Sequence, residues 1–327
     1  SANLSSATSI DRIAIGRAAL SSADFTVQIG ESAVSGGATG ALQYRSQIVS
    51  QETWTTTAAG FAFIDATGNM QKGTGLPLAG TLTADNTAVG SGSLAAITTG
   101  VDNSAFGVNT LNALTSGNRN TAMGDNALAL VSTVSDNTAY GATTLAVLTT
   151  GTRNVAVGGS ALAALTTTNN NTAVGFQAGN TMNTGASNTL LGTYAGNTIT
   201  TGSSNVAVGT SSALGAATTL NTIVGASAGA ATIGDNNTAV GANTLNSAAA
   251  AVTDIVAIGT NALTDALTVG ANGTVAVGTS ALTALTSGAS NTAMGRNAGA
   301  SITTGSSNTV IGHTSASAAT ASNNTIV

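Results

Sequence analysis

The chain has 327 residues, of which 6% are charged and 3% aromatic, with a formal net charge of −5 and no cysteine. This composition excludes a basic surface for binding nucleic acid, and the lack of cysteine excludes disulfide bonds and thiolate ligands. No run of 18 apolar residues is present that could span a membrane. Large side chains are too few to fill a globular core of this length, whereas a mean hydropathy of +0.29 is too high for a disordered linker. The composition therefore favours a thin structure with a narrow core.

Residues 1–30 contain two irregular copies of a short motif that ends in glycine. The first copy is R-I-A-I-G at residues 12–16, and the second is T-V-Q-I-G at residues 26–30. We expect this segment to form irregular β-roll coils, because a similar motif recurs regularly further along the chain.

Residues 31–84 break the period. Residues 61–70 are predicted to form a β-hairpin with its turn near residues 67–68. A solenoid needs bulky side chains to seal a break in its stack. The segment is therefore interpreted as a non-repeat β segment that serves as a cap or joint.

The aromatic residues of this segment permit a second interpretation. Tyr44, Arg45 and Trp54 are side chains that could stack on sugars or on ring faces. They are therefore a possible ligand-contact patch as well as a structural seal.

Residues 85–327 repeat a 17-residue unit with the signature N-T-A-V-G, and such a period is the sequence mark of a solenoid. The first eight signature glycines recur at a constant step, and the later steps differ from it by two positions at most. These glycines are Gly90, Gly107, Gly124, Gly141, Gly158, Gly175, Gly192, Gly209, Gly225, Gly241, Gly259, Gly278, Gly295 and Gly312.

A unit of this length is too short for a helical-hairpin repeat, but it accommodates two short strands separated by glycine turns. We therefore predict an all-β fold, a parallel β-solenoid of about fourteen coils. With about 4.8 Å between coils, the shaft would be roughly 65–70 Å long. A positive φ is expected at the second-turn glycines. These are Gly100, Gly117, Gly151, Gly202, Gly288 and Gly305.

Asparagines recur at the start of each unit and would lie directly above one another in the stack. Stacked amides can hydrogen-bond along the axis, which predicts a structural ladder. Alternatively, asparagine is present only because it tolerates turn conformations. The residues concerned are Asn86, Asn103, Asn120, Asn137, Asn154, Asn171, Asn188 and Asn205.

The position before each asparagine gives a charge ladder of Asp85, Asp102, Arg119, Asp136 and Arg153. Opposite charges meet on three of its four successive steps, and on a sheet surface each pair would contribute about 0.2–1 kcal/mol. Asp85 above Asp102 is the exception. We expect this pair to be solvated rather than to hold a cation, because a hard cation requires six or more oxygen ligands.

Adjacent apolar residues in each signature predict an outward apolar stripe. Neighbouring side chains of a strand point to opposite faces, so one of Ala88 and Val89 fills the core and the other faces outward. Soluble monomers rarely expose a long apolar stripe. We therefore expect it to be buried against other copies of the chain, the alternative being a monomer with scattered apolar surface.

The N-T-A-V-G-x-x-A-L units resemble repeats of phage tail fibres and related bacterial surface proteins, and residues 63–77 resemble a segment often found ahead of such repeats. Residues 12–16 and 274–278 are similar to head repeats of trimeric autotransporter adhesins. Those heads are left-handed parallel β-rolls wound as trimers. The resemblance thus implies a left-handed, β-roll-like coil, intertwined or packed as a homotrimer with Val89-type residues near the shared core.

The sequence offers no catalytic constellation, metal set or cofactor motif, and the chain is predicted not to be an enzyme. Its only histidine, His313, follows a turn glycine, whereas a catalytic triad needs a buried, oriented histidine. Glycan cleavage would need a carboxylate pair in a cleft, which a thin regular coil does not provide.

Three functions remain. The first is the shaft of a phage tail fibre in host attachment, located on the virion tail, with a host-surface glycan or protein bound through an unseen tip. The second is a bacterial surface adhesin or self-assembling extracellular filament. The third, an ice-binding solenoid, would need an unbroken threonine array, but Ala230 and Ala231 interrupt the Thr-Thr pairs.

Overall fold

The computed structural model describes residues 62–64, 70–72, 86–229, 233–248, 250–265, 267–315 and 319–327. All of them belong to the unit Ala58–Val327. The coils predicted for residues 1–30, the possible ligand contacts Tyr44, Arg45 and Trp54, and the ladder residue Asp85 lie outside the described residues.

Two short strands form the predicted hairpin. Strand β1 (Ala62–Ile64) pairs in antiparallel fashion with β2 (Met70–Lys72), with Ile64 opposite Met70. The pairing confirms the hairpin, although its turn lies outside the described residues.

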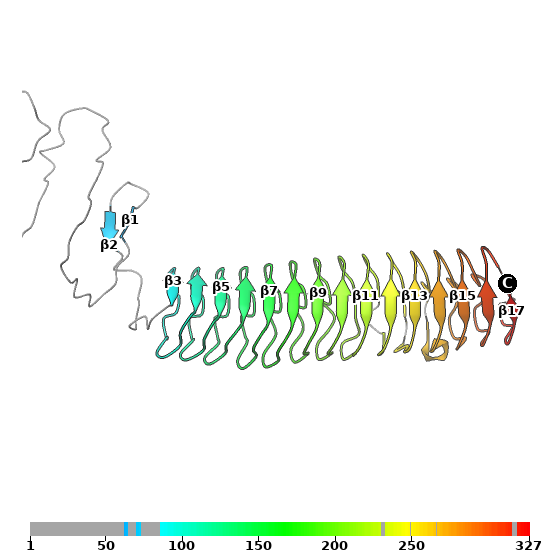
Figure 1. The fold of residues 1–327 in the computed structure, drawn as a ribbon, viewed down its shortest axis with the longest axis horizontal. Helices are drawn as coiled ribbons and strands as arrows, with labels where there is room; N and C mark the ends of the chain where they lie inside the picture. Colours follow the sequence, from blue (N-terminus) through cyan, green and yellow to red (C-terminus); the bar gives the residue numbers. More distant parts are fainter. Residues whose placement is uncertain are drawn as a thin grey trace, which may run out of the picture. The chain divides into compact units, whose positions relative to one another are not determined.

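The repeat region forms one parallel sheet of fifteen strands, β3 to β17, paired strictly in chain order (Figure 1). This confirms the predicted β-solenoid. The strands are β3 (Thr87–Val89), β4 (Ser104–Phe106), β5 (Thr121–Met123), β6 (Thr138–Tyr140), β7 (Val155–Val157), β8 (Thr172–Val174), β9 (Thr189–Leu191), β10 (Val206–Val208), β11 (Thr222–Val224), β12 (Thr238–Val240), β13 (Val256–Ile258), β14 (Val275–Val277), β15 (Thr292–Met294), β16 (Thr309–Ile311) and β17 (Thr325–Ile326).

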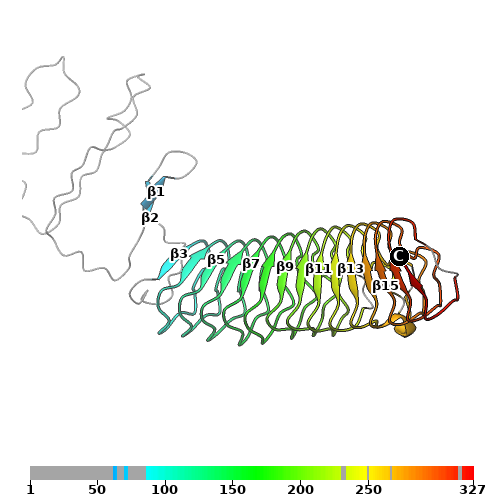
Figure 2. The ribbon, with the colours of Figure 1, turned by 45° about the vertical axis from the view of Figure 1, so that its right-hand side comes forward.

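The coils stack one after another along one axis (Figure 2), and each strand residue pairs with its equivalent in the next coil. In the first pair of strands Thr87 lies opposite Ser104, and the backbone N–H of Thr87 donates to the carbonyl of Asn103 at 2.8 Å. Register is kept even where the coil length changes, as between Val256 and Val275. Each repeat unit therefore makes one turn of the solenoid, and length changes are absorbed outside the strands.

The described coils contain one strand each, whereas two were predicted. On the opposite side of the coil the backbone passes through a left-handed residue, such as Leu94 with φ of 48°, which interrupts an extended strand. The Leu94 N–H still bonds to the next coil, at 3.0 Å from the carbonyl oxygen of Thr110. Left-handed leucines recur at Leu94, Leu111, Leu128, Leu145, Leu162, Leu245, Leu263 and Leu282.

The two sets of glycines are required for different reasons. Gly90 has φ of 126°, and a Cβ there would lie 2.2 Å from the carbonyl oxygen of Gly107. Gly100 does not have a positive φ, so that part of the prediction is wrong. Its Cβ would lie 2.3 Å from the carbonyl oxygen of Gly117. Close stacking of backbones, rather than a left-handed conformation, excludes a side chain at the second turn.

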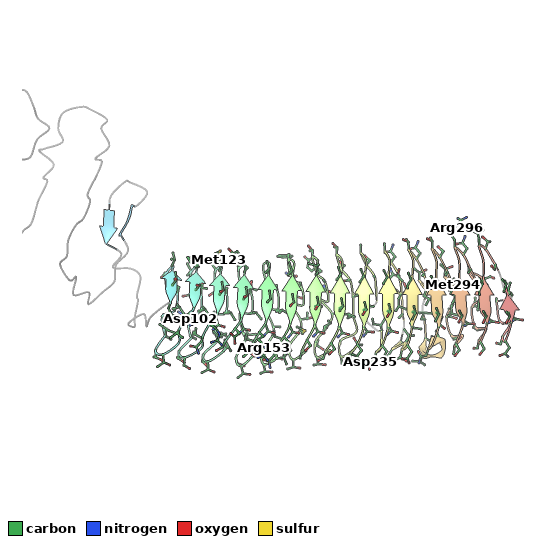
Figure 3. All side chains as sticks on the ribbon, viewed as in Figure 1. Asp102, Met123, Arg153, Asp235, Met294 and Arg296 are labelled. Carbon is green, nitrogen blue, oxygen red and sulfur yellow. The ribbon has the colours of Figure 1, made fainter. Side chains whose placement is uncertain are left out.

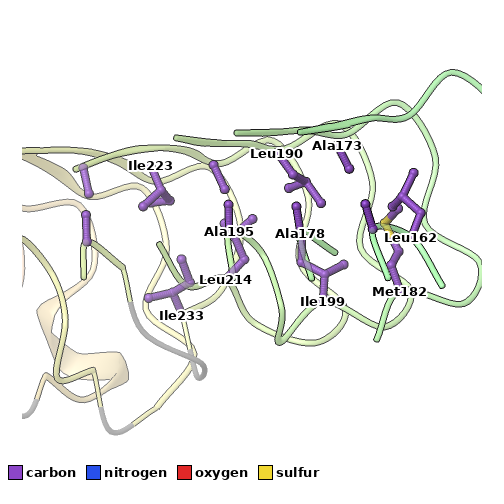
Figure 4. Packing of buried hydrophobic residues seen from close by; sticks show 14 of the residues in the cluster. Leu162, Ala173, Ala178, Met182, Leu190, Ala195, Ile199, Leu214, Ile223 and Ile233 are labelled. Atoms are coloured by element: carbon purple, nitrogen blue, oxygen red, sulfur yellow. The ribbon is translucent and has the colours of Figure 1, made fainter. Parts of the chain in front are cut away.

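Side chains follow the coils in rows along the solenoid (Figure 3). The middle residue of each strand from β3 to β16 points inward and is buried, as with Ala88 and Ala105. Core residues compensate for one another between coils. Leu190 takes the place that alanine has in most strands, such as Ala173 in the neighbouring strand (Figure 4). It fills the space beside Gly179 and Gly196. A Cβ on Gly179 would lie 2.5 Å from Leu190 Cδ1.

Replacing Leu190 by alanine is expected to leave a cavity that the glycines on both sides cannot close. Large-to-small core substitutions of this kind cost about 2–5 kcal/mol of unfolding free energy. Urea denaturation would measure the loss, with Leu130→Ala as the control because Leu130 is 60% exposed. Equal effects of the two substitutions would contradict the packing described.

Candidate functional site

From Asn86 to Asn237 the asparagine side chains form a continuous ladder inside one corner of the solenoid. Asn103 Nδ2 donates to Asn86 Oδ1 at 3.1 Å and to the carbonyl oxygen of Gly117 at 2.8 Å. Asn103 Oδ1 accepts from both the backbone N–H and Nδ2 of Asn120, each at 3.0 Å. Each amide thus closes its own coil and bonds to both neighbouring coils. The eight predicted asparagines take part, followed by Asn221 and Asn237.

The burial of the asparagine side chains decides between the two explanations of the asparagine column. Asn103 and the following ladder asparagines are almost completely buried. None of them has a positive φ; the left-handed residue is the one before, for example Asp102 with φ of 60°. The asparagine is therefore placed by its hydrogen bonds rather than by tolerance of a turn.

A second ladder, which the sequence analysis missed, lies two residues before the asparagines. There a side-chain oxygen accepts the backbone N–H of the equivalent residue in the preceding coil. Asn118 Oδ1 accepts from Val101 N–H at 2.9 Å, and Asn169 Oδ1 accepts from Thr152 N–H at 2.7 Å. The signal in the sequence is the recurrence of Asn, Ser or Asp at this position.

Threonine hydroxyls form a third row on the side of the second turn. Thr98 Oγ1 donates to the carbonyl oxygen of Thr115 at 2.9 Å, and Thr115 Oγ1 donates to that of Ser132 at 2.9 Å. The same contact joins Thr149 to Thr166. These hydroxyl protons are therefore bonded to the protein itself along the axis.

The charge ladder gives one ion pair among the described residues. Arg119 Nε and Nη2 donate to the two carboxylate oxygens of Asp136 at 2.6 and 3.1 Å. Arg153 instead donates to Asn170 Oδ1 at 2.8 Å. Asp102 makes no ion pair and contributes only a longer-range attraction to Arg119. The column runs through left-handed turn residues and not along the strands, which corrects the prediction of a sheet-surface ladder.

The hydrogen bond from Arg119 lowers the pKa of Asp136 below its ordinary value and raises that of Arg119. The pair therefore favours the folded state above the ordinary aspartate pKa, and this contribution disappears as the pH falls through the lowered pKa. Because the two side chains are 59% and 36% exposed, the effect is small. Asp136→Asn should lower the thermal midpoint slightly at pH 7 and by progressively less as the pH falls; a difference that grows at low pH would contradict this assignment.

The outward face of the sheet, which we call the strand face, carries the first and third residues of each strand. The first residue is threonine, serine or valine, and the third is a large apolar residue in every strand from β3 to β16. None of these residues is charged. Val89, Leu191 and Met294 are 48%, 47% and 50% exposed. In Figure 3, Asp102, Arg153 and Asp235 lie on one side of the strand row and Arg296 on the other.

Potential metal ligands do not cluster in the described part of the chain. No three histidine, aspartate or glutamate side chains there lie close enough to hold a metal ion. His313 is exposed and contacts Arg296 and Thr314. A groove of about 530 Å³ is lined by residues 215–218, 233–235, 250–251 and 253, and Asp235 is its one ionisable side chain.

No helix among the described residues combines the length and apolar character needed to cross a membrane. The fold defines the class of the protein as a β-solenoid repeat protein. Comparisons with protein-family models, curated proteins and solved structures found no significant match.

Proposed function

We propose that this chain is a non-enzymatic structural fibre whose solenoid is the shaft of a phage tail fibre involved in host attachment. The observation that carries the proposal is the unbroken fifteen-stranded sheet, in which buried amides bond coil to coil. At about 4.8 Å per coil, the sheet extends roughly 65–70 Å. Dense hydrogen bonding along one axis gives the stiffness that a shaft needs to hold an attachment site away from a particle.

The partner we propose for the strand face is the same face of other copies, in a homotrimer as the sequence resemblance implies. A face roughly 65–70 Å long and about 10 Å wide, three residues at about 3.3 Å each, offers on the order of 650–700 Å² per copy, somewhat below the about 800 Å² per partner of a standard interface. The large apolar residues repeat at the spacing of the coils, so an identical rod in parallel register matches them coil by coil. The absence of charged residues on this face removes the main cost of burying it.

The same face favours a second candidate, a bacterial surface adhesin or a self-assembling extracellular filament. An uncharged face along the length of a rod supports lateral association of copies on a cell surface as well as on a virion. The two candidates differ in location and not in the mechanics of the shaft. Labelling purified virions and intact bacterial cells with an antibody against the chain separates them.

Electron microscopy of the purified chain, together with its mass in solution, tests the proposal. We expect thin rods whose solenoid shaft is roughly 65–70 Å long. We expect a mass three times that of the 31.1 kDa chain. Rods with the mass of a single chain would overturn the self-association but retain the shaft. Compact particles would overturn both.

A further inference from the structure

The asparagine ladder is interrupted at two successive coils. Asn237 Oδ1 accepts the backbone N–H of Ile255 at 3.0 Å, and the side chain of Ile255 has no polar atom to continue the chain of hydrogen bonds. The next position holds Thr274, whose Oγ1 is buried and has no hydrogen-bond partner. The ladder resumes where Asn308 Nδ2 donates to Asn291 Oδ1 at 3.0 Å. We call the coils from residue 255 to residue 290 the ladder gap.

Coil length also departs from the usual period at this place. Asn237 and Ile255 are 18 residues apart, and the step from Val256 to its partner Val275 is longer still. The extra residues include the short helix η3 (Val269–Ala271), which lies below the strand row in the yellow-to-orange part of Figure 1. The strands themselves remain paired, with Val256 N–H bonded to the carbonyl oxygen of Thr274 at 2.9 Å. The backbone ladder thus continues where the side-chain ladder stops.

The missing amides weaken these coils more than a surface change would. In an intact coil the asparagine closes the coil on itself, as Asn291 does by donating to the carbonyl oxygen of Gly305 at 2.8 Å. Neither Ile255 nor Thr274 makes that closure. In a stacked repeat protein, stability is the sum of repeat stabilities and nearest-neighbour interfaces, and the weakest unit opens first.

We propose that the ladder gap is a built-in opening point, at which the solenoid opens locally while the coils before it remain stacked. The proposal concerns the fold and does not depend on the function of the fibre. Fraying from the C-terminal coil is the competing explanation for local opening. Fraying makes amide exchange fastest in β16 and progressively slower through β15 and β14. Opening at the gap instead makes β13 and β14 exchange at least as fast as β15.

Hydrogen exchange of the full chain, followed by mass spectrometry, distinguishes these patterns, and Thr274→Asn tests the cause. Asparagine is similar in volume to threonine, and its amide at residue 274 could reach the carbonyl of Gly288 and the N–H of Asn291. Each restored hydrogen bond is expected to slow exchange in the gap about fivefold. Thr279→Asn, on the exposed surface of the same coil, is the control and should change nothing.

The reverse substitution, Asn137→Thr, should create fast exchange in β6 and β7, where wild type is protected. If that variant fails to fold, Thr274→Asn alone decides the question. The proposal is overturned if exchange slows steadily from β16 to β13 in wild type, or if Thr274→Asn leaves exchange in the gap unchanged.

Discussion

Replacing Asn154 by alanine is expected to lower the free energy of unfolding by roughly 3–5 kcal/mol, because it leaves several buried polar groups without partners. Asn154 Nδ2 donates to Asn137 Oδ1 at 3.1 Å and to the carbonyl oxygen of Thr168 at 2.9 Å. Asn154 Oδ1 accepts from the backbone N–H and the Nδ2 of Asn171 at 3.0 and 3.2 Å. Denaturant unfolding followed by circular dichroism measures the loss.

The matched control is Asn180→Ala, in the following coil. Asn180 is partly exposed, and its side chain makes one long contact, 3.5 Å to Gln177 Oε1. Its replacement should change the unfolding midpoint little. Similar losses for the two variants would mean that the ladder contributes no more than an ordinary surface asparagine.

The ladder also explains how the coils keep register while their lengths vary. A slip of one residue would move the inward residue of a strand outward, and it would also separate each buried amide from its partners in both neighbouring coils. A buried polar network is costly when only partly satisfied. Val206 pairs with Thr222 across a shortened coil, and this pairing therefore keeps the same inward position, Ala207 beside Ile223.

Much of the fold followed from spacing alone. The regular period of the signature predicts stacked coils because equivalent residues must then be neighbours. The alternation of Ala88 and Val89 predicts one inward and one outward row, and the structure places Ala88 inside and Val89 on the strand face. The asparagine column was visible in the sequence, but burial was needed to choose between its two explanations.

Other features could not be read from the sequence because residue preferences point elsewhere. Leucine disfavours the left-handed region, so a second strand was the natural expectation at Leu94, which has φ of 48° and is 1% exposed. Burial in the core compensates for the strained backbone. Glycine at position 100 was expected to supply a positive φ, yet close approach to Gly117 is what requires it. Such contacts are set by the spacing of stacked backbones, which only the assembled coil defines.

The second large effect is expected for Val174→Asp, which should prevent assembly of the fibre while leaving the solenoid folded. Val174 lies in the middle of the strand face, beside Val157 and Leu191 in the neighbouring strands. Its side chain points outward and is not part of the core. In the proposed homotrimer, identical carboxylates would be brought together in an apolar interface, where an unpaired charge costs several kcal/mol. Light scattering should therefore give the mass of a single chain, 31.1 kDa.

Thr167→Asp places the same charge on an exposed residue of the turn side and should leave the assembly intact. Val174→Thr keeps the shape of the side chain and matches the threonines already present on the strand face, so it should weaken assembly only partly. The order wild type, Val174→Thr, Val174→Asp identifies desolvation of the strand face as the cause. If Val174→Asp still forms an intact oligomer with an unchanged circular-dichroism spectrum, the copies associate through a surface other than the strand face.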